Sequence, residues 1–133
     1  MLPPASAALA ARMAEVPPLL RFLPEDTDSF NTNYLGGALS KADGYAFGAL
    51  AVLDGLCPTL VLNAEYDDLR ASGEAFTAAL ALAGVDVRQV MVPGVLHGFL
   101  NTRPDLEPVD DALTLMAHVV ATARIPELLE IPA

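Results

Sequence analysis

Residues 59–67, Thr-Leu-Val-Leu-Asn-Ala-Glu-Tyr-Asp, and residues 87–97, Val-Arg-Gln-Val-Met-Val-Pro-Gly-Val-Leu-His, decide the fold of this chain. The first stretch opens with a short apolar run over residues 59–63, which is typical of a strand buried on both faces in a parallel sheet. The second stretch carries an apolar run that stops before Pro93-Gly94. Two strands are therefore predicted.

The segment between these stretches has the periodicity of a helix. Residues 72–83 place Phe76, Leu80 and Ala83 on one helical face, and Gly84 follows as a natural end of the helix. A strand, a helix and a strand in this order form a βαβ unit, whose crossover is right-handed. The sequence therefore predicts an α/β fold with parallel strands.

Further helices are predicted before this unit. Residues 6–15 form a short amphipathic pattern that ends before Pro17, and a second helical pattern follows Pro24 and ends at Gly36-Gly37. The stretch from residue 40 to residue 53 has no clear period, so we expect it to be irregular.

One helix is predicted after the unit. It opens at Pro108 and carries Leu113, Met116 and Val120 as apolar residues. His118 falls on the polar side of this helix, so we expect it to face solvent and assign it no role.

The composition excludes several classes of function. Of the 133 residues, 53% are hydrophobic, as in one compact soluble domain. Seventeen acidic residues against seven basic ones give a formal charge of −10, which disfavours nucleic acid and anionic membrane surfaces as partners. No apolar run approaches the ~20 residues of a spanning helix, and no signal peptide is recognisable, so the expected location is cytoplasmic.

The sequence predicts no metal site or cofactor. Cys57 is the only cysteine, so neither an internal disulfide nor a zinc pattern is available. The acidic residues are scattered and form no metal cluster. We interpret Cys57, which precedes the first strand, as a small buried hydrophobic residue.

Asp67 and His97 are the candidate catalytic residues. Because parallel strands point their carboxyl ends to one edge of the sheet, the loops that follow them lie side by side. An imidazole base needs a carboxylate on its other ring nitrogen. Taken singly, each has a plainer interpretation: Asp67 as a turn residue, Asp68 beside it as the cap of the next helix, and His97 as a solvated loop residue.

Four blocks of the sequence carry a family resemblance. They are Asn63-Ala-Glu-Tyr-Asp67-Asp68-Leu69-Arg70, Ser72-Gly-Glu-Ala-Phe76, Ala83-Gly-Val-Asp-Val87 and Pro93-Gly-Val-Leu-His97-Gly-Phe99. Their order and spacing resemble the end of bacterial hormone-sensitive-lipase-like esterases. The resemblance implies that Asp67 is the triad acid, because it precedes Leu69-Arg70 at the family's spacing, and that His97 is the base. Asp68 stands where the family usually has proline.

The resemblance also implies a fold and an activity. It identifies the chain as the C-terminal portion of an α/β-hydrolase fold, a βαβ unit with parallel strands plus flanking helices. Residues 1–48 correspond to a helical and irregular region before the acid-bearing strand, and residues 49–133 to the C-terminal βαβα part of the core. The implied activity is hydrolysis of a small-molecule carboxylic ester. Phe30, Tyr34 and Leu35 are candidates to line an acyl pocket, although core packing is the plainer interpretation.

The nucleophile and the oxyanion hole are missing from this sequence. None of Ser6, Ser29, Ser40 and Ser72 lies in a Gly-x-Ser-x-Gly elbow, and each is better explained as a cap or loop hydroxyl. Two strands alone would also leave an apolar edge at residues 59–63. We therefore expect a truncated product, a gene fragment or half of a split hydrolase, completed by an N-terminal half or by self-association. The alternative is a non-catalytic hydrolase remnant or an interaction module.

Overall fold

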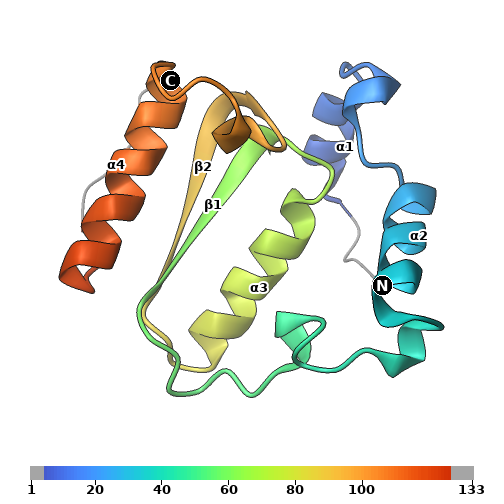
Figure 1. Ribbon diagram of the computed structural model, residues 1–133, viewed down its shortest axis with the longest axis horizontal. Coiled ribbons are helices and arrows are strands. Elements are labelled where there is room, and N and C mark those ends of the chain that lie inside the picture. Colours follow the sequence, from blue (N-terminus) through green and yellow to red (C-terminus); the bar gives the residue numbers. More distant parts are fainter. Residues whose placement is uncertain (1–4, 127–133) are drawn as a thin grey trace.

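The computed structural model describes residues 5–126 of the protein. Its main elements, in chain order, are α1 (Ala7–Met13), α2 (Pro24–Leu35), β1 (Thr59–Tyr66), α3 (Arg70–Leu82), β2 (Val87–Leu96) and α4 (Glu107–Thr122). β1 and β2 are parallel, and α3 covers one face of the pair while α4 covers the other (Figure 1). The predicted α/β fold, with a βαβ unit and flanking helices, is confirmed.

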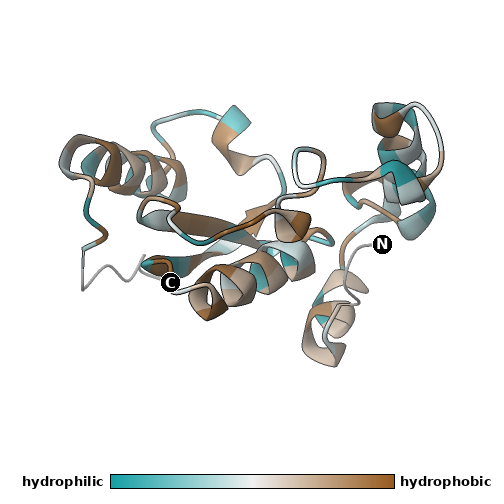
Figure 2. Ribbon diagram, turned by 90° about the horizontal axis from the view of Figure 1, so that it is seen from below, coloured by the Kyte–Doolittle hydropathy of each residue, from teal (hydrophilic) through white to brown (hydrophobic). Residues whose placement is uncertain are grey.

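The continuous apolar run of β1 follows from this cover on both faces. Val61 packs against a cluster that includes Leu80 of α3. Leu60 and Leu62 instead line an apolar groove with Met116 of α4. Figure 2 shows the hydrophobic strands enclosed between the helices on either side. Successive side chains of a strand point to opposite faces, so both faces must be apolar where both are covered.

Two small clusters hold the helices to the strands. Leu80 is fully buried against Leu53 and Val85. Leu9 and Met13 of α1 pack against Ala71 at the start of α3. This second cluster joins the N-terminal segment to the loop that follows β1, which is where the candidate acid lies.

α3 approaches β1 closely at Gly73. A Cβ atom at this position would lie 2.2 Å from Oδ1 of Asn63, and Asn63 is only 6% exposed. The absence of a side chain at Gly73 therefore creates the space that the Asn63 amide fills.

The second strand is longer than the sequence predicted. β2 continues through Pro93 and Gly94 to Leu96, and its register against β1 shifts between Ala64 and Tyr66. Ala64 pairs with Val92, whereas Tyr66 pairs with Leu96. Proline lacks an amide hydrogen for the ladder, and the irregular register accommodates it without ending the strand.

Several apolar residues lie in other environments than predicted. Cys57 is exposed, so its interpretation as a buried residue is wrong. Phe30 and Tyr34 are 57% and 74% exposed, so core packing is also wrong for them within the described residues. Thr27 is the buried residue of α2.

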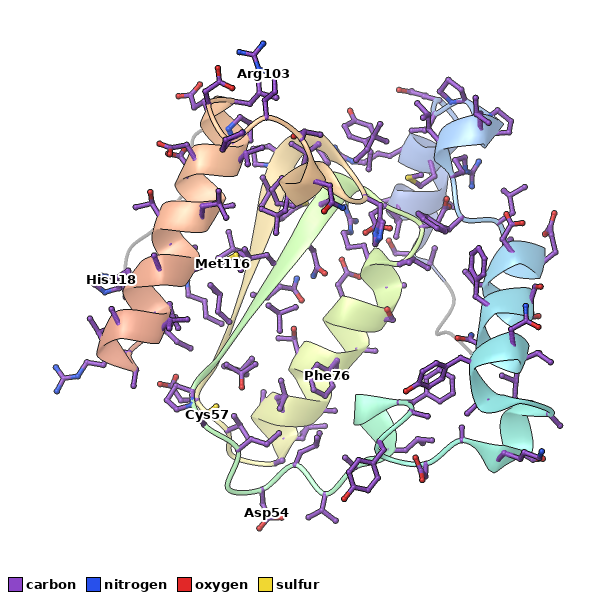
Figure 3. All side chains as sticks on the ribbon, in the orientation of Figure 1. Asp54, Cys57, Phe76, Arg103, Met116 and His118 are labelled. Atoms are coloured by element: carbon purple, nitrogen blue, oxygen red, sulfur yellow. The ribbon has the colours of Figure 1, made fainter. Side chains whose placement is uncertain are left out.

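The apolar residues of α4 differ in how deeply they are buried. Its buried residues are Val109, Ala112 and Leu115, whereas Leu113 is 40% exposed and Val120 84%. His118 is exposed, as predicted. In Figure 3 it projects from the outer side of α4, away from the strands.

Candidate active site

The candidate acid is held by the turn between β1 and α3. Asp67 follows the last residue of β1 and is 8% exposed. Its Oδ1 accepts a hydrogen bond of 2.8 Å from the backbone N–H of Leu69. This Asx-type bond occupies one carboxylate oxygen and leaves the other free to bind a second partner.

The candidate base is placed by the irregular end of β2. Gly94 and Gly98 both have positive φ, +70° and +78°, a region that side chains with a Cβ rarely adopt. The N–H of Gly94 donates to Oε2 of Glu65 at 2.8 Å. Glu65 also forms an ion pair with Arg12. A carboxylate at the end of β1 thus holds the bulged part of β2 that leads to His97.

The structure brings Asp67 and His97 into direct contact. Nδ1 of His97 lies 2.8 Å from Oδ2 of Asp67, and the His97 side chain remains 43% exposed. With Nδ1 directed at the carboxylate, Nε2 lies on the opposite edge of the ring. This geometry orients the imidazole and leaves Nε2 to exchange a proton with another group.

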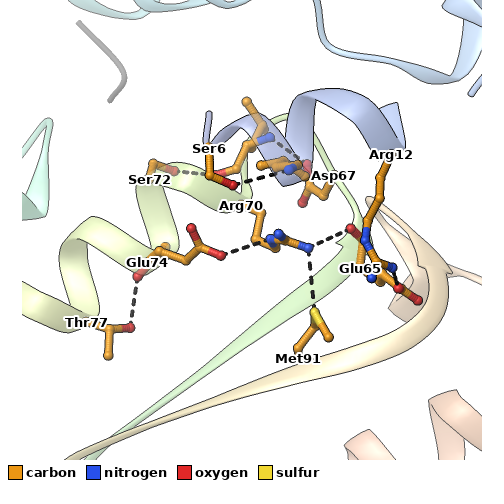
Figure 4. Close-up of polar contacts among 12 residues, drawn as sticks. Ser6, Arg12, Glu65, Asp67, Arg70, Ser72, Glu74, Thr77 and Met91 are labelled. Carbon is orange, nitrogen blue, oxygen red and sulfur yellow. Dashed lines mark hydrogen bonds and ion pairs between the residues drawn. The ribbon is translucent and has the colours of Figure 1, made fainter. Parts of the chain in front are cut away.

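A buried arginine connects the segments around the candidate acid. Arg70, which is 8% exposed, donates from Nη1 to the carbonyl oxygen of Glu65 at 2.9 Å. Its Nε lies 3.0 Å from Oε1 of Glu74, and Nη1 lies 3.5 Å from the sulfur of Met91 (Figure 4). The guanidinium therefore ties the end of β1 to α3 and to β2.

The interpretation of Asp68 as the cap of α3 is wrong. The N-cap position of α3 is Leu69, without a side-chain cap. Asp68 instead accepts hydrogen bonds from Arg21, at 2.9 Å from Nη2 to Oδ1 and 3.3 Å from Nε to Oδ2. Its Oδ2 also accepts the backbone N–H of Phe22 at 3.0 Å. The hydrogen bond with Asp68 raises the pKa of Arg21 above its ordinary value.

Phe22 lies directly against the candidate base. The Phe22 and His97 rings meet edge to face, with centroids 4.8 Å apart and planes at 72°. Sequence analysis missed Arg21, Phe22 and Glu65. The Arg21–Asp68 pair is separated by 47 residues, and no local periodicity or motif connects the two.

Comparison with known proteins assigns the chain to a family. The model of the family described as alpha/beta hydrolase fold matches residues 4–101. The chain belongs to this family. The match covers α1 to the end of the loop that carries His97, so the resemblance inferred from the four sequence blocks is confirmed at the level of the family.

Two relatives that the chain resembles in sequence are named as ester hydrolases. The chain is 40% identical over 78 residues to the carboxylic ester hydrolase LipN of Mycobacterium tuberculosis, covering 57% of this chain and 21% of LipN. It is 33% identical over 70 residues to an ethyl acetate hydrolase of Pseudomonas putida, covering 53% of this chain and 22% of that enzyme. The matches thus extend over about a fifth of the length of these relatives.

Solved structures of the family agree with the fold. EstE1, a thermostable carboxylesterase from a metagenomic library, superposes with a TM-score of 0.73 and 29% identity over 95% of this chain and 42% of EstE1. An esterase of Pyrobaculum calidifontis superposes with a TM-score of 0.60 and 36% identity over 65% of this chain and 28% of that esterase.

The cavity beside α3 in residues 5–126 does not include the candidate site. One cavity of about 470 Å³ lies between α3 and the segment at residues 39–50, and neither Asp67 nor His97 lines it.

The described residues contain no group of three or more His, Cys, Asp or Glu able to hold a metal ion. In the same part of the chain, a helix of the length and apolar character needed to cross a membrane is absent.

Proposed function

We propose that this chain is the acid-and-base part of a serine-dependent carboxylic ester hydrolase. The observation that carries the proposal is the 2.8 Å contact between Nδ1 of His97 and Oδ2 of Asp67. The activities of the two curated relatives, both ester hydrolases, support the substrate class.

In the proposed reaction, His97 takes the proton of a serine hydroxyl while the serine oxygen attacks the carbonyl carbon of the ester. It then returns this proton to the alcohol as the carbon–oxygen bond breaks, which leaves an acyl-enzyme. In the second half, His97 takes a proton from water, the hydroxyl attacks the acyl carbon, and the carboxylic acid leaves as serine recovers its proton. Asp67 stabilises the imidazolium in both halves.

We propose that the nucleophile comes from residues outside this sequence, on a longer polypeptide or on a second chain. The hydroxyls of Ser6 and Ser72 engage in local hydrogen bonds, accepting from Leu9 N–H at 3.2 Å and donating to Leu69 O at 2.7 Å. The sheet of the described residues contains only β1 and β2, so each strand has one open edge. A complementary part would supply further strands as well as the serine and the oxyanion hole.

A chimera tests the proposal. The segment of EstE1 that matches this chain is replaced by the chain itself, and hydrolysis of p-nitrophenyl acetate is measured. We expect turnover that falls about 10⁴- to 10⁶-fold with His97→Ala and about 10⁴-fold with Asp67→Asn, as for other triads. The matched control is His118→Ala, at the exposed histidine of α4, which is expected to leave turnover unchanged.

The purified 133-residue chain provides the companion measurement. Alone, it is expected to hydrolyse the ester no faster than its His97→Ala variant, because it lacks the nucleophile. A folded chimera without turnover would favour the non-catalytic remnant. A chimera whose turnover survives His97→Ala would refute the role of His97.

A further inference from the structure

The two adjacent aspartates after β1 bind different partners. Asp67 binds His97, whereas Asp68 receives three hydrogen bonds from the segment before α2, two from Arg21 and one from the backbone of Phe22. The Arg21 and Asp68 side chains are only 24% and 16% exposed. A fork of two charge-assisted hydrogen bonds, partly shielded from water, constrains orientation as well as distance.

This anchoring determines where the Phe22 ring lies. Because Asp68 binds both the Arg21 side chain and the Phe22 amide, it fixes the backbone immediately beside the ring. The ring then packs edge to face on His97, at a centroid distance of 4.8 Å. Edge-to-face contact is a preferred arrangement of aromatic rings and adds a directional attraction to the burial of their surfaces.

A single hydrogen bond does not hold an imidazole still. Asp67 restrains His97 only through Nδ1, and the His97 side chain is 43% exposed. The ring can therefore turn away from the carboxylate toward solvent unless a second contact opposes the rotation. Phe22 provides this second contact.

We propose that Asp68 and Arg21 are positioning residues that act through Phe22 to keep His97 oriented toward Asp67. We call Arg21, Phe22 and Asp68 the histidine clamp. The clamp rests on the proposed function only in that His97 is taken as the base of the reaction. The clamp also explains the presence of Asp68 at a position where the esterases resembled by this sequence usually have proline.

Nuclear magnetic resonance of the ¹⁵N-labelled 133-residue chain tests the clamp without any turnover. The chain contains two histidines, so His118 serves as an internal reference for an imidazole that is exposed to solvent. In the unsubstituted chain, neutral His97 is expected to carry its proton on Nδ1 and to show cross-relaxation with the Phe22 ring. In Asp68→Ala and Phe22→Leu, its ring ¹⁵N shifts are expected to move toward those of His118.

Controls separate positioning from a purely structural role. Asp105→Ala removes an exposed carboxylate paired with Arg103 and is expected to leave His97 unchanged. Asp68→Asn keeps an oxygen for the Phe22 amide and is expected to fall between the unsubstituted chain and Asp68→Ala. Unchanged His97 signals in Phe22→Leu, which retains the Arg21–Asp68 pair, would overturn the proposal even if Asp68→Ala does not fold.

The EstE1 chimera adds a kinetic test. Phe22→Leu is expected to lower kcat about 10- to 100-fold with little change in KM, because a displaced base affects the proton transfer more than ester binding. A raised KM with unchanged kcat would overturn the clamp. An inactive chimera would count against the proposed function alone, since the magnetic resonance measurement still decides whether the clamp orients His97.

Discussion

Gly73→Ala is the most informative test of how α3 packs on β1. In most helices this substitution stabilises by about 1 kcal/mol through helix propensity. Here the new Cβ would lie 2.2 Å from Oδ1 of Asn63, whereas ordinary contacts begin near 3.4 Å, so the amide must move by about 1.2 Å. Because Asn63 is 6% exposed, we expect an overpacking cost of about 3 kcal/mol and a net destabilisation of about 2 kcal/mol.

A double-mutant cycle isolates this contact. Asn63→Ala removes the amide, so Gly73→Ala in that background is expected to stabilise by about 1 kcal/mol, a coupling of about 3 kcal/mol between the two sites. Urea unfolding followed by circular dichroism at 222 nm, a general helix signal, measures all four proteins. If Gly73→Ala has the same sign and size in both backgrounds, the close approach at Gly73 does not determine its effect and the reasoning is refuted.

Three further predictions concern other elements. Leu80→Ala is expected to cost about 2–5 kcal/mol because Leu80 is fully buried, whereas Leu82→Ala, 90% exposed, is expected to stay within about 0.5 kcal/mol; urea unfolding compares the two. Ser6→Ala is expected to cost about 1 kcal/mol, through loss of the N-cap bond to α1, measured as a lower unfolding midpoint. The hydrogen bond from Arg103 lowers the pKa of Asp105, so Arg103→Gln is expected to raise that pKa toward its ordinary value; carboxyl titration by magnetic resonance would contradict this if the value stayed lowered.

The βαβ unit could be predicted because its signals are local. The apolar run at residues 59–63 and the helical face containing Leu80 identified β1 and α3, and parallel pairing followed from their order. The placement of Asp67 and His97 in neighbouring loops followed from the same topology. Their contact is observed, whereas their catalytic roles remain proposals that the chimera tests.

Other features could not be predicted, because they depend on contacts between distant segments. The exposure of Phe30 and Tyr34 depends on which face of α2 meets the rest of the protein, and helical spacing alone does not specify this. The role of Asp68 was misjudged for a similar reason. A local cap competes with a partner elsewhere in the chain, and here Arg21, 47 residues away, binds the carboxylate.

By itself, the sequence determined the order and type of the main elements, the shared edge at which Asp67 and His97 lie, and the family. These follow from the periodicity of side chains and from short motifs, which act within a few residues. Only the tertiary structure decided which oxygen of Asp67 meets His97, how Glu65 holds the bulge of β2, and that Phe22 packs on the imidazole. Each of these depends on distances between atoms far apart in the chain, and folding alone brings such atoms together.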